Sequence, residues 1–73
     1  MYKVTYVNVG SEMVTKDVVY HVDTDVEMMA LVEAECRDIL GCSFTGLNLI
    51  DEVHFGVYND GWFTGTVDIV KMR

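Results

Sequence analysis

The side chains with the widest chemical range in this sequence are two cysteines and two histidines, Cys36, Cys42, His21 and His54. A structural zinc site takes its ligands from closely spaced pairs, because each pair holds two corners of one tetrahedron. Five residues separate Cys36 from Cys42, and the two histidines lie far apart in the chain. The spacing therefore favours no metal site, and we expect no cofactor.

The remaining reactive groups do not favour catalysis either. A cysteine nucleophile needs a base or the positive end of a helix beside it, whereas both cysteines fall at the negative end of the helix predicted over residues 25–40. Adjacent acids such as Asp51 and Glu52 would need a cleft between them for glycosidase-like chemistry, which a chain of 73 residues seldom provides. The glycines form no phosphate-binding loop. We therefore expect that the protein is not an enzyme.

Apolar and polar residues alternate along four predicted strands, which cover residues 2–9, 13–22, 47–58 and 62–70. Turn signals at Gly10-Ser11 and Asn59-Asp60-Gly61 join neighbouring strands into hairpins. Residues 42–46 are expected to form a loop. Asp51 and Glu52 interrupt the third strand, where two adjacent acids predict a bulge or a bend.

A single helix is predicted between the hairpins. Thr24-Asp25-Val26-Glu27 matches a capping box, in which the threonine hydroxyl and the glutamate carboxylate satisfy backbone N–H groups at the helix start. Gly41 supplies the left-handed residue that ends many helices, so the helix is expected over residues 25–40. At about 100° per residue, an apolar stripe that includes Val32, Cys36 and Ile39 forms the buried side.

The order of these elements predicts an α+β fold of two layers, β-β-α-β-β, with a four-stranded antiparallel sheet and one helix packed on one face. The chain is expected to form one globular domain, residues 1–73. The other sheet face is open, and a surface around Tyr6, His54 and Trp62 is a second candidate binding site. Monomer and homodimer both remain open, because an exposed strand edge permits pairing with another chain.

Composition restricts the partners and the compartment. Twelve acids against five lysines and arginines leave a formal charge of −7, which disfavours direct binding of nucleic acid or an anionic membrane. There is no apolar run of about 18 residues for a membrane span and no signal-peptide pattern at the start. Two cysteines without a secretion signal fit reduced thiols. We therefore expect a cytoplasmic protein.

The acids are concentrated in the chain. Eleven acids and one base, Arg37, lie between residues 17 and 70, although an ordinary surface mixes both signs. Carboxylates can replace phosphates opposite lysine and arginine, so this layout favours a protein that occupies a positively charged groove. Leu31 would be an apolar anchor among the acids, and the expected partner-binding residues are Asp23, Asp25, Glu27, Leu31, Glu35 and Asp38. The competing interpretation is a solvated face that keeps the domain soluble.

The stretch Val18–Ala30 is a strand that runs into a capped helix. With the small size, the acidity and the hairpin–helix–hairpin order, it is similar to small bacteriophage-encoded inhibitors: anti-CRISPR proteins, anti-restriction proteins and inhibitors of uracil-DNA glycosylase. The resemblance is one of architecture over the whole chain, without a diagnostic motif. It implies tight binding to a basic host protein or nucleoprotein complex in the bacterial cytoplasm, without catalysis. The alternative is an interaction or subunit module that binds its partner through the open sheet face.

Overall fold

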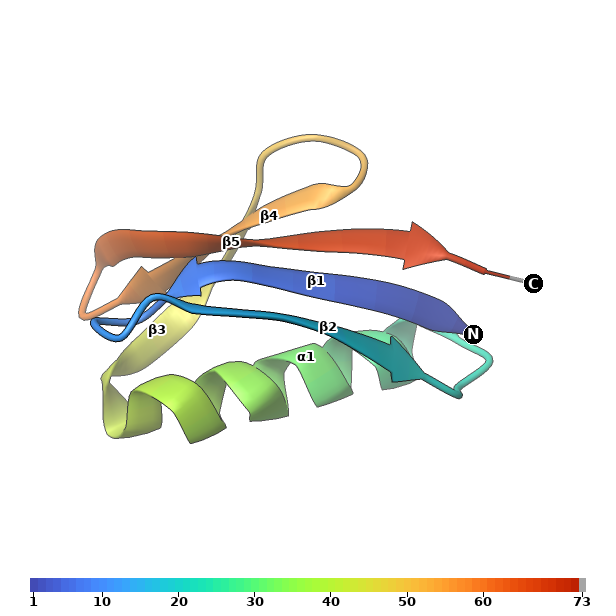
Figure 1. Cartoon of the computed structure of the whole chain (residues 1–73), viewed down its shortest axis with the longest axis horizontal. Helices are drawn as coiled ribbons and strands as arrows, with labels where there is room; N and C mark the ends of the chain where they lie inside the picture. Colours follow the sequence, from blue (N-terminus) through green and yellow to red (C-terminus); the bar gives the residue numbers. More distant parts are fainter. Residues whose placement is uncertain (73) are drawn as a thin grey trace.

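The computed structural model describes residues 1–72 as a five-stranded antiparallel sheet with one long helix across one face (Figure 1). The strands are β1 (Tyr2–Val9), β2 (Val14–Tyr20), β3 (Phe44–Leu49), β4 (His54–Asn59) and β5 (Trp62–Lys71). The helix α1 (Asp25–Leu40) is followed by one 3₁₀ turn, η1 (Gly41–Ser43). The order across the sheet is β2-β1-β5-β4-β3, so the first and last strands of the chain are central neighbours.

The α+β class and the two layers agree with the sequence, but the strand number does not. The predicted strand over residues 47–58 is two strands, because β3 ends at Leu49 and the chain reverses before β4 begins at His54. Asp51 makes this turn, since its Oδ1 accepts hydrogen bonds from the backbone N–H groups of Val53 and His54, each at 3.0 Å. The acids therefore mark a turn, which agrees with the predicted bend and not with the alternative of a bulge, and this turn divides the predicted strand in two. Residues 44–46, expected in a loop, belong to β3.

The helix α1 begins and ends at the predicted residues, and the β4–β5 hairpin turn lies where it was predicted. The Thr24 hydroxyl accepts a hydrogen bond from the Glu27 backbone N–H at 3.2 Å, so the threonine half of the predicted capping box is formed. The Glu27 Oε1 accepts from the Thr24 hydroxyl at 2.8 Å and not from a backbone N–H as predicted. Gly41 has φ 69° after the helix, and Gly61 has φ 81° in the β4–β5 turn. Neither helix between residues 1 and 72 has the length and apolar character needed to cross a membrane.

A bulge in β1 decides which of its side chains are buried. Asn8 has φ 52°, and the register with β2 shifts between Tyr6 and Val9, which places Val9 in the core together with Val4 and Tyr6. Gly65 of β5 lies against this bulge. A Cβ atom there would be 2.6 Å from the carbonyl oxygens of Val7 and Asn8, so only glycine permits this approach.

The core lies between α1 and the covered face of the sheet, and its buried side chains are Tyr2, Val4, Tyr6, Val9, Met28, Val32, Cys36, Val57, Val67 and Ile69. The predicted helix stripe is confirmed for Val32 and Cys36, which are fully buried, whereas Ile39 is half-buried. Tyr6 was expected on the open face, and this was wrong. It points toward the helix, and its hydroxyl lies 2.6 Å from the Tyr20 hydroxyl in a shared hydrogen bond.

Candidate functional site

Four of the predicted partner-binding residues share one side of α1, the side next to β2. Glu27, Leu31, Glu35 and Asp38 fall together because successive residues turn by about 100° around the helix axis. Glu27, Leu31 and Asp38 are exposed, and Leu31 retains 39% of its accessible surface. We call these four residues the acidic helix face. With a rise of about 1.5 Å per residue, its acids extend over about 16 Å along the helix.

Glu35 is less available than the sequence suggested. It is half-buried and forms an ion pair with Lys16 of β2, at the border between the helix and the sheet. This contact raises the pKa of Lys16, because the hydrogen bond to Glu35 favours the charged ammonium. Sequence periodicity could not show the pair, since it depends on β2 lying beside α1. Glu35 therefore holds the helix against the sheet edge.

Asp25 lies apart from the acidic helix face. It begins α1 on the sheet side, where the hydroxyl of Tyr2 donates a hydrogen bond to its Oδ1. That hydrogen bond, together with the burial of the ring and the negative charge of Asp25, raises the pKa of Tyr2 to about 12. Asp23 is exposed in the connection before the helix. The structure thus separates the six predicted residues into the acidic helix face, the free Asp23 and the internally bonded Asp25.

The outer part of the acidic helix face keeps its negative charge. Among residues 1–72, no ion pair reaches Asp23, Glu27 or Asp38. The one arginine of the helix, Arg37, lies on another side, 3.5 Å from Glu33 and over the ring of Phe44. Glu27 and Asp38, toward the two ends of the acidic helix face with Leu31 between them, therefore have no internal counter-ion among the described residues, whereas Glu35 is paired with Lys16.

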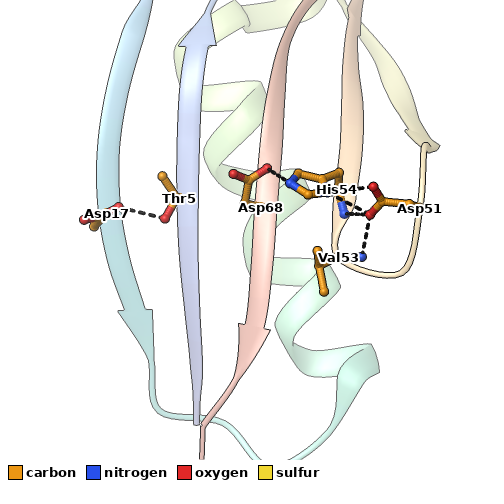
Figure 2. A network of polar contacts seen from close by, with 6 residues as sticks. All are labelled: Thr5, Asp17, Asp51, Val53, His54 and Asp68. Carbon is orange, nitrogen blue, oxygen red and sulfur yellow. Dashed lines mark hydrogen bonds and ion pairs between the residues drawn. The ribbon is translucent and has the colours of Figure 1, made fainter.

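The open face of the sheet carries a row of polar side chains that crosses four strands (Figure 2). The Thr5 hydroxyl of β1 donates to Oδ1 of Asp17 on β2 at 2.8 Å. Asp68 of β5 pairs with Thr5 on one side and with His54 of β4 on the other. The alternation of apolar and polar residues along the strands predicts a mix of tyrosine, threonine, histidine and aspartate on this face. That these residues form one row depends on the strand order.

His54 lies between two carboxylates in this row. Its Nδ1 is 2.7 Å from Oδ1 of Asp51, and its Nε2 is 3.4 Å from the buried Oδ1 of Asp68. The hydrogen bond to Asp51 raises the pKa of His54. The pKa of Asp51 is lowered by the backbone N–H of Val53 and then by His54. Both ring nitrogens face acids, so the ring favours the imidazolium form and offers no free nitrogen as a general base.

Two aromatic side chains, Tyr58 and Phe63, lie together on the open sheet face at the end of the β4–β5 hairpin and are called the aromatic patch. Trp62 was also expected on the open face, and this was wrong, because it is paired with Asn59 and lies on the helix-covered side. Trp62 and Phe63 retain 77% and 57% of their accessible surface. Phe63 meets Tyr58 edge to face at 5.9 Å. Alternation along the predicted strand 62–70 puts Phe63 on the same side as Val67 and Ile69 and so predicts it in the core, and this prediction was wrong. A register shift in the β4–β5 ladder moves Phe63 out of the core, and no residue pattern indicates that shift.

No family model, no curated protein and no solved structure matched the chain. Within the part of the chain that the structure describes, no group of three or more histidines, cysteines, aspartates or glutamates is placed to hold a metal ion. The geometry defines a two-layer α+β domain whose candidate sites are two surfaces, the acidic helix face and the open sheet face with its aromatic patch.

Proposed function

We propose that this protein is a small, acidic, phage-encoded inhibitor that binds a host nucleic-acid-handling complex in the bacterial cytoplasm and occupies its basic groove. The observation that carries the proposal is that Glu27 and Asp38, on the same side of α1 as the exposed Leu31, form no ion pair within residues 1–72. Lysine and arginine side chains that normally contact phosphates would contact Glu27 and Asp38 instead. Leu31 would supply the apolar anchor at the centre of the contact.

The structure of α1 suits such a binding surface. Thr24 caps the first turn, and the buried Val32 and Cys36 hold an adjoining side of the helix against the sheet. The acids are therefore displayed on a rigid element, which lowers the entropy lost on binding. The excess of negative charge also speeds the encounter with a basic partner, and this contribution weakens with ionic strength.

The first experiment is capture of partners from a bacterial lysate at low and high salt, followed by mass spectrometry. The test variant is Glu27→Lys with Asp38→Lys, because both carboxylates belong to the acidic helix face and neither has an ion-pair partner among residues 1–72. The matched control is Glu12→Lys with Glu52→Lys, which changes the net charge equally at exposed sites away from the acidic helix face.

We expect the parent and the control to capture the same basic partner at low salt and to lose it at high salt. The test variant should lose it at low salt as well, with affinity lower by at least about tenfold. Equal capture by all three proteins would show that the acidic helix face is only a solvated surface. Loss by the control alone would contradict the assigned location.

A second candidate function is an interaction or subunit module that binds through the open sheet face. It is favoured by the aromatic patch, because exposed aromatic rings are typical centres of protein interfaces, and Phe63 retains 57% of its accessible surface. Phe63→Ala should then abolish capture, while the acidic-face variant has no effect. Binding of this kind would persist at high salt, which separates it from the charge-driven proposal.

A further inference from the structure

The two edge strands of the sheet differ in how they are protected. β2 carries Lys16 and Asp17, and charges on an edge strand hinder pairing with another chain. β3, at the opposite edge, has no charged side chain. It lies in an uncharged run from Ile39 to Ile50, although seventeen of the 73 residues are charged. The β3 edge is therefore open to strand pairing.

The backbone of β3 has free groups on its outer side. The Ile50 N–H donates to the His54 carbonyl at 2.9 Å, so Ile50 is in a hydrogen-bonded pair with β4. Because such pairs alternate along an antiparallel ladder, the N–H and C=O groups of Leu47 and Leu49 point away from β4. In residues 1–72, no backbone hydrogen bond from outside the β3–β4 ladder reaches these two leucines.

Apolar side chains accompany these free groups. Leu49 and Ile50 retain 67% and 57% of their accessible surface. Leu49 is opposite Phe55 of β4, which lines a groove of about 330 Å³ between α1 and β4 together with Met28, Met29 and Val53. The helix-covered side of the sheet thus continues through Leu49 as an exposed apolar surface up to the β3 edge, while Ile50, opposite His54, lies on the other face.

We propose that β3 pairs antiparallel with β3 of a second copy of this chain, around a two-fold axis at Asn48, which joins the two five-stranded sheets into one. A two-fold axis pairs residues symmetrically about its position, so Leu47 of each copy is opposite Leu49 of the other. These are the residues with outward-pointing backbone groups, and each leucine pair can exchange two hydrogen bonds. Both helices then lie on the same face of the joined sheet.

The charge distribution favours a second copy as the occupant. Each copy carries −7, but the acidic helix face lies beside β2, at the edge of the sheet that is farthest from β3. The strands that meet are themselves uncharged, so pairing brings no like charges directly opposite each other within β3. The outward-pointing backbone groups of Leu47 and Leu49 can also pair with the same groups of an identical strand, as an interface between identical copies requires.

Analytical ultracentrifugation of the full chain tests the proposal over a wide range of concentrations. We expect a monomer–dimer equilibrium that Leu49→Lys weakens by at least about tenfold, because a lysine at the edge removes the leucine contact and adds a charge. Leu49 is exposed, so the fold should persist, as circular dichroism would confirm. Val19→Lys on β2 is the matched control, since Val19 is also exposed on an edge strand and should leave the dimer unchanged.

Cross-linking tests the register independently. Asn48→Cys, in a chain that also carries Cys42→Ser, places two thiols at a non-hydrogen-bonded pair, where Cα atoms lie about 4.5 Å apart, within disulfide range. Mild oxidation should then yield a covalent dimer. The proposal is overturned if the parent sediments as a monomer at every concentration, or if Val19→Lys weakens the dimer as much as Leu49→Lys. Faster cross-linking through Leu47→Cys than through Asn48→Cys would overturn the Asn48-centred register.

Discussion

The imidazole of His54 contacts the carboxylate of Asp51 within the β3–β4 turn, and its Nδ1 lies 2.7 Å from Oδ1 and 2.8 Å from Oδ2 (Figure 2). Asp51 also accepts backbone hydrogen bonds within the turn, so one side chain carries both the turn geometry and the ion pair. The stability of this turn therefore depends on two titrating groups.

The contribution of this pair to stability should depend on pH in a defined window. The pKa of His54 is raised above its ordinary value of 6.5, so its contribution is complete below that value and is lost as pH rises through the higher folded pKa. The pKa of Asp51 is lowered from 3.8, so its contribution is complete above that value and is lost as pH falls through the lower folded pKa. Urea unfolding should show a larger difference between the parent and His54→Gln near pH 5 than near pH 9. An equal difference at both would contradict the assigned ion pair.

Substitutions at two valines of α1 should separate its buried and exposed sides. Val32 is fully buried and Val26 retains 81% of its accessible surface. Val32→Asp places an unpaired charge in the core, which should cost more than about 3 kcal/mol and unfold a domain of this size. Val26→Asp adds the same charge in the first turn and should change stability by less than about 0.5 kcal/mol. Circular dichroism with thermal unfolding measures both, and a folded Val32→Asp variant would show that the stripe is wrongly placed.

Gly65 should be the least replaceable glycine of the sheet. A Cβ atom there meets two backbone oxygens at 2.6 Å, which cannot move without disturbing the β1 bulge. Gly65→Ala should therefore destabilise the fold by about 3 kcal/mol. At Gly56 a Cβ atom meets the rings of Phe63 and Tyr58 at 3.3 Å, and these side chains can adjust. Chemical denaturation should show a smaller loss for Gly56→Ala, and the reverse order would argue against the described bulge.

The two cysteines should differ sharply in reactivity. Both are free thiols; Cys36 is buried in the core and Cys42 is exposed. Burial raises the pKa of Cys36 to about 11, which disfavours the reactive thiolate. In a Cys42→Ser variant, thiol labelling should occur only as fast as the protein opens, and urea should accelerate it. Rapid labelling of that variant under native conditions would show that the helix does not cover Cys36.

Local sequence signals predicted the local structure well. The cap at Thr24 and the glycines at positions 41 and 61 act through residues only a few positions away. Thr24 caps the helix and both glycines have the predicted positive φ, although the Glu27 carboxylate bonds the Thr24 hydroxyl and not a backbone N–H. The buried stripe of α1 follows from helical periodicity, which depends only on the helix itself. These features could be predicted because their causes lie within one element.

The errors arose where several elements meet. Bulges change which side of a strand is buried, so Phe63 lies outside the core although its spacing matched Val67 and Ile69. The ion pair that occupies Glu35 and the polar row through His54 both require the strand order β2-β1-β5-β4-β3. Strand order follows from contacts between distant segments, which the spacing of residues within one segment does not encode.

The central position of β1 and β5 has a consequence for how the chain folds. Tyr2 is paired with Lys71, so the middle of the sheet joins the two segments that are most distant in sequence. Such nonlocal pairing slows folding, because a large loop must close before its contacts are gained. During synthesis on a ribosome, β1 can pair with β5 only after β5, near the end of the sequence, has emerged. The hairpin β1–β2 and the helix can form earlier, but the barrier to the finished sheet should depend on this last strand.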